Sequence, residues 1–219
     1  MKVVAFVPIK LDNERLPGKN LRMMIDKRPL ISRILETTSN IGIIDEKYVF
    51  CSSKEVVSYL PRGVNFLERN PKLDGPQVKA MELINGFVDA VDADVYVLLH
   101  ATAPFLSAKT IEECINAVTL RGHDSACPVV EIRDYIWTSG KPNYDLSNIP
   151  RTQDLEPILV ETSGLFVFTK QCFLENNARI GKNPYFHKVS RKEATDIDYL
   201  EDFELANAYI ITEQTLNER

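Results

Sequence analysis

The apolar positions of this chain follow two spacings, one typical of buried strands and the other of helices. Short β-branched or wholly apolar runs predict strands at residues 2–8, 48–51, 95–99 and 125–130. Apolar residues three and four positions apart predict helices at residues 29–38, 77–91, 110–120 and 202–212. Strands and helices therefore take turns along the chain, which indicates an α/β protein with right-handed crossovers.

The predicted strands indicate where a ligand would bind. The wholly apolar run at residues 95–99 is the expected central strand of a parallel sheet, since such strands are buried on both faces. Ligands of open α/β sheets bind at the carboxyl ends of the strands. The loop that follows residues 2–8 is then delivered to the ligand edge.

A different pattern appears between about residues 133 and 169. Aromatic and turn-forming residues are frequent there, and short strands are expected at residues 158–160 and 165–168. We interpret this segment as an inserted arm. The rest of residues 1–219 is expected to form one domain, since a chain with 44% hydrophobic residues can bury a single large core.

Charge and cysteine content narrow the partners and the compartment. The formal net charge of −5 argues against nucleic acid as a partner, so phosphate binding needs a local group of basic residues. No run is apolar enough to span a membrane, and residues 1–20 lack a signal-peptide pattern. Together with well-separated cysteines, expected to be buried thiols, this predicts a cytoplasmic protein without membrane contact: Cys51, Cys114, Cys127 and Cys172.

The loop after the first strand is rich in cations. Lys10, Arg15 and Lys19 lie within ten residues of one another, together with Pro17 and Gly18. Backbone N–H groups and basic side chains can surround the oxygens of a triphosphate. The sequence lacks both common glycine-rich phosphate patterns, so a solvated turn with surface lysines is the alternative.

An acidic pair precedes the last predicted helix. Asp196 and Asp198 flank one residue, and carboxylate oxygens are ligands that suit Mg²⁺. Alternatively, Asp198 merely caps the helix, with Glu201 and Asp202 as favourable acids of its first turn.

Four segments together resemble a known enzyme family. The loop VPIKLDNERLPGKN (7–20) resembles the signature loop of the cytidylyltransferases that activate acidic sugars, the CMP-sialic acid and CMP-Kdo synthetases. LLHATAPF (98–105) is similar to the family's LLQPTSPL, and PRTQDLEP (150–157) followed by SGLFVF (163–168) is similar to RRQDLPP followed by NGAxY. DIDYLEDFELA (196–206) is similar to DIDxxEDLELA. The order is the same, and the resemblance covers nearly the whole chain.

The resemblance implies a Rossmann-like, three-layer α/β enzyme with a mostly parallel mixed sheet, often a homodimer through an inserted arm. Such enzymes join CTP to a sugar and release pyrophosphate with Mg²⁺. Lys19 matches the family's phosphate-binding lysine, and Asn20 the asparagine that follows it. Lys10 stands where the family usually has arginine, which retains the charge without the bidentate fork. Asp196 and Asp198 are the implied metal ligands, and Lys19 and Asp198 the candidate catalytic residues; metal-bound hydroxide is the alternative base.

The loop also departs from the family. Asn13 and Glu14 replace a serine and its neighbour, and a carboxylate beside a triphosphate would repel it. We therefore expect Glu14 to pair with Arg15, which matches the RLPGK version of the motif. Asn13 and Arg15 are kept among the nucleotide-binding candidates.

Two further residues, Arg69 and Ser52, are expected to contact the nucleotide. Arg69 resembles an arginine that faces the nucleotide in the family, and a surface arginine is the alternative. Ser52 follows the second strand at the expected ligand edge. Ser52 and Ser53 are equally suited to cap a helix.

The acceptor sugar is expected to meet three residues. His100 occupies the place of a family glutamine, although without the resemblance a satisfied core histidine is the better interpretation. Arg151 and Gln153 are candidates for binding a sugar carboxylate, for which a guanidinium is well suited. The asparagine before the family's glycine is Ser163 here, so different acceptor contacts are expected.

The predicted function is thus the condensation of CTP with a sialic, legionaminic or Kdo-like acid. One alternative is a nucleotidyltransferase with another acceptor, or a GT-A glycosyltransferase, which shares a Rossmann-like core and a D-x-D pair. A second is a nucleotide-binding relative without activity, suggested by Lys10, Asn13 and Glu14.

Overall fold

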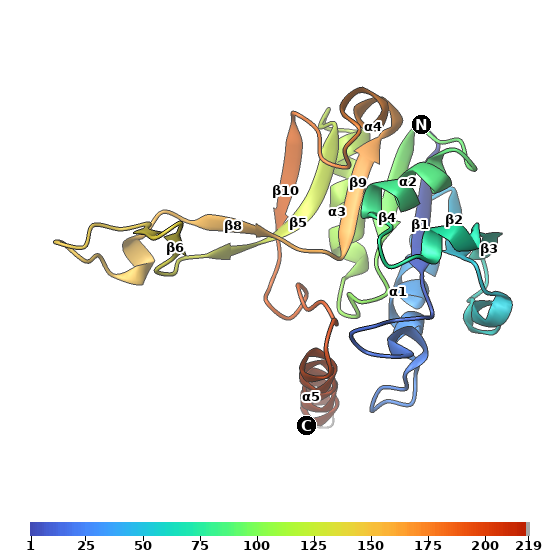
Figure 1. Cartoon of the computed structure of the whole chain (residues 1–219), viewed down its shortest axis with the longest axis horizontal. Coiled ribbons are helices and arrows are strands. Elements are labelled where there is room, and N and C mark those ends of the chain that lie inside the picture. Colours follow the sequence, from blue (N-terminus) through green and yellow to red (C-terminus); the bar gives the residue numbers. More distant parts are fainter. Residues whose placement is uncertain (218–219) are drawn as a thin grey trace.

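A computed structural model describes residues 1–217 of the chain. Its main sheet has the strand order β10-β5-β9-β4-β1-β2-β3, and β8 pairs with β5 outside this row (Figure 1). All neighbours in the row are parallel except β9, which is antiparallel to both β4 and β5. The predicted α/β class and the mostly parallel mixed sheet are confirmed.

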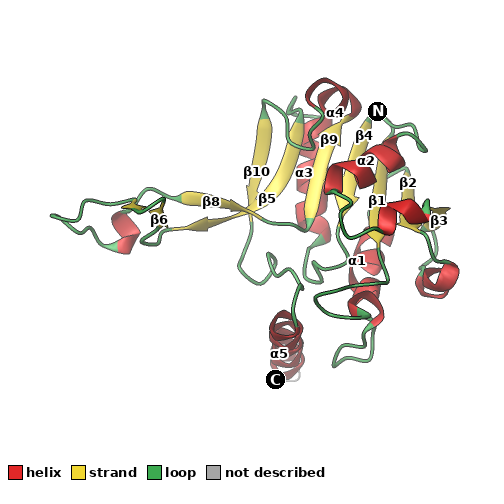
Figure 2. Cartoon of the chain, viewed as in Figure 1, coloured by secondary structure: helices red, strands yellow, loops and turns green. Residues whose placement is uncertain are grey.

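Helices cover both faces of the sheet, which gives the three predicted layers (Figure 2). Helices α1 (Leu30–Ser39) and α3 (Ala108–Thr119) pack on one face, in a core that contains Val97 of the central strand. Helices α2 (Ala80–Val88) and α4 (Lys170–Asn176) pack on the other face, in a core that contains Tyr96. Successive residues of one strand therefore serve opposite cores, as the period of two requires.

The predicted strands whose carboxyl ends form the expected ligand edge are present, and their bounds are close to the predicted ranges. Strand β4 spans Val95–Leu99, as expected, and all its residues are buried. It is the middle strand of the row, parallel to β1 and antiparallel to β9. The remaining predicted strands are β1 (Val3–Ile9), β2 (Glu46–Cys51) and β5 (Ser125–Ile132).

Several elements were not predicted or have other bounds. The expected helix at residues 77–91 is shorter in the structure, where α2 ends at Val88, and the closing helix is longer, since α5 spans Leu200–Asn217. The pattern did not predict α4 or two edge strands, β3 (Asn65–Glu68) and β10 (Pro184–Lys188). Edge strands are exposed on one side, so both lack a continuous apolar run.

The predicted arm is present but ends earlier than expected. Strands β6 (Trp137–Thr138) and β7 (Lys141–Pro142) form a small hairpin that projects from the domain together with β8 (Ile158–Glu161) (Figure 1). Strand β9 (Leu165–Thr169) instead lies in the main sheet between β4 and β5. We use "the arm" for residues 133–162; the expected end at residue 169 is wrong because β9 is a buried core strand.

Helix α5 packs against the loop that follows β1. Phe203, Ala206 and Ile210 of α5 share a buried cluster with Leu16 and Met24 of that loop region. This cluster brings the last helix to the start of the chain. No helix of the described residues is long and apolar enough to cross a membrane. The cysteines at the four predicted positions are buried free thiols.

Candidate nucleotide site

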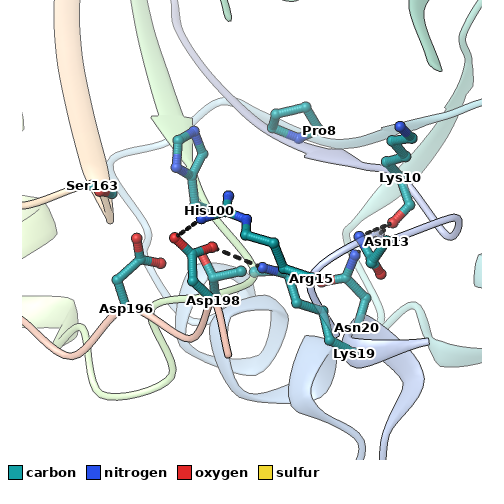
Figure 3. Close-up of a pocket in the computed structure, with 12 residues that line it drawn as sticks. Pro8, Lys10, Asn13, Arg15, Lys19, Asn20, His100, Ser163, Asp196 and Asp198 are labelled. Carbon is teal, nitrogen blue, oxygen red and sulfur yellow. Dashed lines mark hydrogen bonds and ion pairs between the residues drawn. The ribbon is translucent and has the colours of Figure 1, made fainter. Parts of the chain in front are cut away.

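A pocket of about 350 Å³ opens at the carboxyl ends of β1 and β4 (Figure 3). A second pocket of about 200 Å³ adjoins it and shares Lys10, Asn13, Arg15 and Lys19 with it. The first pocket is lined by residues from four separate segments of the chain: Pro8, Lys10, Asn13, Arg15, Lys19, Asn20, His100, Ala101, Thr102, Ser163, Asp196 and Asp198. Most of the predicted site residues thus meet in one place.

The loop after β1 is held by two asparagines. The side-chain amides of Asn13 and Asn20 both donate to the carbonyl oxygen of Lys10, at 3.1 and 2.8 Å. Gly18 has φ 66°, a left-handed conformation that glycine adopts without strain, and it starts the short 3-10 helix Lys19–Leu21. The turn therefore brings Lys19 and Asn20 back toward Lys10.

These asparagines leave acceptors free in the pocket. The Oδ1 atoms of Asn13 and Asn20 are buried and accept no hydrogen bond from the described residues. An unpaired buried acceptor is costly, so both atoms are poised to receive a donor from a ligand.

Lys19 joins the loop to the acidic segment. Its side chain is almost fully buried, and its Nζ donates to the carbonyl oxygen of Ile197 at 2.7 Å and to Asp198 Oδ1 at 3.1 Å. Arg15 Nη1 donates to the other oxygen of Asp198. The expected pairing of Arg15 with Glu14 is wrong, because Asp198 offers the arginine a carboxylate inside the site while Glu14 is exposed.

Asp198 does not cap helix α5. The backbone N–H groups of Asp198 and Tyr199 donate to Asp202 Oδ2 at 2.9 and 2.8 Å, so Asp202 satisfies the first turn of the helix. This leaves the Asp198 carboxylate directed at Lys19 and Arg15 (Figure 3). The capping alternative for Asp198 is therefore wrong.

The acidic pair fits the requirements of Mg²⁺. Asp196 Oδ1 is buried and accepts no hydrogen bond from any described residue, which makes it available as a ligand. No group of three or more His, Cys, Asp and Glu side chains suited to a metal occurs in residues 1–217. Mg²⁺ usually takes one or two carboxylates and completes its shell with water and substrate phosphates. Two carboxylates such as Asp196 and Asp198 match that donor set, with Asp196 Oδ1 free and the Asp198 oxygens shared with Lys19 and Arg15.

His100 lines the pocket as a neutral side chain. Burial is the main cause that lowers the pKa of His100 to about 4. The negative charge of Asp196 raises this pKa, and the positive charges of Arg179 and Lys19 lower it. Its ring lies 6.3 Å from the ring of Phe166, between centroids. A neutral imidazole both donates and accepts a hydrogen bond, so His100 can contact a hydroxyl group in the pocket.

Arg69 and Ser52 do not line the pocket. The guanidinium of Arg69 is buried and donates to the carbonyl oxygens of Ile9 at 2.8 Å and Phe50 at 3.1 Å, at the ends of β1 and β2. It also pairs with Asp74. Arg69 is neither a surface arginine nor a residue of the pocket wall, and it ties two strands to a following turn. Ser53 rather than Ser52 caps the next 3-10 helix.

Arg151 and Gln153 lie on the arm and do not line the pocket. Both are exposed, and Arg151 donates from Nε and Nη2 to Asp154 at 2.7 and 3.0 Å. Within one chain the structure therefore separates them from His100, the third predicted acceptor contact.

The sequence profile of the cytidylyltransferase family matches residues 4–214. This chain belongs to the cytidylyltransferase family. It is 23% identical over 217 residues to an N-acylneuraminate cytidylyltransferase of Streptococcus agalactiae, covering 93% of this chain and 52% of the relative. It is 22% identical over 231 residues to a bifunctional pseudaminic acid cytidylyltransferase and sugar-nucleotide hydrolase of Helicobacter pylori, covering 96% of this chain and 43% of the relative. The chain thus spans about half the length of these curated relatives.

The fold is that of solved cytidylyltransferases. A CMP:2-keto-3-deoxy-manno-octonic acid synthetase solved with CTP superposes with a TM-score of 0.70 at 14% identity, covering 97% of this chain and 100% of that chain. The TM-score establishes the shared fold.

Sequence reasoning missed the part of the site that backbone geometry builds. The segment after β4 contributes Ala101 and Thr102, and the carbonyl oxygen of Thr102 accepts from Ile197 N–H at 2.9 Å. A Cβ on Gly164 would lie 2.7 Å from Ala103 Cβ, so the turn beside Ser163 packs closely on this segment. In this member of the family, the motif ATA after a buried strand was the available signal, because small residues permit such an approach.

Proposed function

We propose that this chain is a nucleotidyltransferase that transfers a cytidylyl group from CTP to an acidic sugar and releases pyrophosphate. The observation that carries the proposal is the meeting of Lys10, Arg15 and Lys19 with Asp196 and Asp198 in one pocket. Family membership supports the choice of CTP. The activities of the relatives, on N-acylneuraminate and pseudaminic acid, support an acidic sugar as acceptor.

The reaction joins a sugar hydroxyl oxygen to the α-phosphorus and breaks the bond from that phosphorus to the bridging oxygen of the β-phosphate. The hydroxyl proton passes to a base, for which Asp198 is our candidate. Negative charge grows on the departing pyrophosphate, and fixed cations stabilise it. Lys19 is our candidate for this role, supported by its buried Nζ, which Ile197 and Asp198 hold in the pocket. Lys10 and Arg15 add charge on the same side of the pocket.

Asp196 and Asp198 would hold the Mg²⁺ that accompanies the nucleotide. When bound, such an ion neutralises phosphate oxygens and helps to orient the triphosphate. The free Oδ1 atoms of Asn13 and Asn20 would accept from donors of the nucleotide. His100 and Ser163 lie on the side of the pocket left for the acceptor, where neutral donors and acceptors can orient a hydroxyl group.

A pyrophosphate-release screen tests this proposal. CTP, ATP, GTP and UTP are each offered with Mg²⁺ and either N-acetylneuraminate, a Kdo-type acid, pseudaminic acid or no sugar. We expect pyrophosphate only when CTP and one of the acids are both present. Release of a nucleoside diphosphate from a sugar nucleotide would favour the glycosyltransferase alternative. CTP binding without turnover on any acid would favour a relative that only binds nucleotide.

We also propose a homodimer that forms through the arm. Large exposed apolar side chains that gather on one segment are typical of a protein–protein interface. The arm exposes six of them: Tyr135, Trp137, Leu146, Ile149, Leu159 and Val160. In such a dimer, Arg151 and Gln153 could reach an acceptor in the partner's pocket. Light scattering after gel filtration should give twice the chain mass, and Trp137→Asp should shift it toward a monomer. A wild-type monomer at micromolar concentration would refute the dimer.

A further inference from the structure

The acceptor side of the pocket lacks a cation in its lining. All lysine and arginine residues that line the first pocket come from the loop after β1: Lys10, Arg15 and Lys19. The opposite side holds the neutral groups His100, Thr102 and Ser163 beside the carboxylate of Asp196, with no lysine or arginine in the lining there (Figure 3). An acid bound there would need a positive charge close to His100.

Arg179 supplies a positive charge on that side. It lies between α4 and β10, and its Cζ stands 3.5 Å from the centroid of the Phe166 ring. Phe166 in turn lies beside His100, with 6.3 Å between ring centroids. Burial lowers the pKa of His100 most, and the positive charge of Arg179 lowers it further.

The guanidinium is fixed but keeps donors free. Arg179 Nη2 donates to Glu161 Oε1 at 3.1 Å, the one hydrogen bond that its side chain makes to residues 1–217. The side chain remains 27% exposed. A guanidinium has five N–H donors in a rigid fork. Glu161 and the Phe166 ring therefore orient Arg179 and leave most of its N–H groups able to donate to a ligand.

We propose that Arg179, stacked on Phe166 and oriented by Glu161, binds the carboxylate of the acceptor sugar and selects acidic over neutral acceptors. The inference rests on the proposed function and names a residue for its substrate class. Arg151, the sequence-based candidate for this role, already pairs with Asp154 on the exposed arm. Arg179 has the same fork geometry on the domain itself, stacked on the ring of Phe166, which lies beside His100 of the pocket lining.

Substitution of Arg179 combined with a change in the sugar tests the pairing. The acceptor that wild type uses best is compared with its carboxamide, which has the same shape without the negative charge. We expect wild type to prefer the acid by about tenfold or more in kcat/KM, the scale of a lost charged hydrogen bond. Arg179→Gln should raise the KM for the acid by a similar factor, remove the preference over the carboxamide and leave the KM for CTP unchanged. Arg179→Lys should fall between the two.

The chain offers a matched control. Arg121 also stacks on an aromatic ring, with Cζ 4.6 Å from the centroid of Tyr185, and also pairs with a glutamate, Glu113. It does not line the pocket. Arg121→Gln should lose the same kind of local contacts and keep the preference for the acid.

The outcomes separate the two proposals. An Arg179→Gln protein that still prefers the acid over the carboxamide, with an unchanged melting temperature, refutes the role of Arg179 and leaves the cytidylyltransferase activity standing. Absence of turnover by wild type on every acid refutes the proposed function, and the role of Arg179 falls with it. Equal loss with the acid and the carboxamide would assign Arg179 a structural role and also refute the inference.

Discussion

Substitution of Lys19 by methionine should damage both stability and nucleotide use. Methionine has a similar length and fills the space, so the change removes the charge and the donor. The Ile197 carbonyl oxygen loses its 2.7 Å partner, and Asp198 loses one of its two cations. An unsatisfied buried acceptor costs about 1–3 kcal/mol. The ion pair between Lys19 and Asp198 adds nothing to this loss of stability, because the Asp198 side chain is 30% exposed and water screens its charge.

The effect on melting and on catalysis can be measured separately. For a domain of this size, about 2 kcal/mol corresponds to a decrease of about 4–8 °C in melting temperature. Loss of a fixed cation from developing phosphate charge should lower kcat/KM for CTP by about 100- to 1000-fold. Calorimetry or circular dichroism gives the first value, and coupled pyrophosphate release the second.

Lys10→Met is the matched control for this prediction. Lys10 lines the same pocket, but its Nζ donates to no residue in the described part of the chain. We expect Lys10→Met to weaken CTP binding while the melting temperature stays within about 1 °C of wild type. A Lys19→Met protein that melts and turns over CTP like wild type would show that Lys19 neither ties the loop down nor meets the phosphates.

Three other substitutions address the metal, the buried arginine and the histidine. Asp196→Asn should raise the Mg²⁺ concentration needed for half-maximal pyrophosphate release by about tenfold, without changing melting, and an unaltered requirement would remove Asp196 from the metal site. Arg69→Met should lower the free energy of unfolding by about 2–4 kcal/mol in urea titrations while folded protein keeps its KM for CTP, since the lost bonds go to backbone carbonyls. For His100, the pKa of about 4 lies below the usual 6.5, so the folded state resists protonation and stability decreases as pH falls from about 6.5 to about 4. His100→Gln should therefore lose less stability than wild type between pH 7 and 4.5, by at most about 3 kcal/mol, and identical pH profiles would contradict this.

The buried strands and the loop chemistry could be predicted because they depend on local pattern. The run at residues 95–99 is apolar at every position, which is typical of a strand covered on both faces, and it is the middle strand of the sheet. The basic residues of the first loop and the acidic pair follow strand ends or precede a helix. Topology then brings them to one edge, as confirmed by the contact between Lys19 and Asp198.

The errors come from choices that local pattern does not decide. The sequence suggested the neighbouring Glu14 as the partner of Arg15. The fold shows that Arg15 instead pairs with Asp198, which lies 183 positions away in the sequence. Arginine often binds ligands, but the guanidinium of Arg69 donates to backbone carbonyl oxygens at the ends of two strands. Residues 165–168 were predicted as part of the arm, because a short apolar run does not show with which strands it pairs. In the structure this strand runs antiparallel to β4 and β5 in the main sheet.

The reversed direction of β9 has a consequence for how this domain can vary. Because β9 runs against β4 and β5, it starts at the border of the sheet at which β5 runs outward, and the outer residues Val129–Ile132 of β5 pair with β8 instead. The chain thus leaves and re-enters the sheet at one border, with the tip of the arm between Ile132 and Ile158 outside it. A tip in this position can be lengthened, shortened or exchanged without a change in the strand pairing of the main sheet or in the loop that carries Lys10, Arg15 and Lys19.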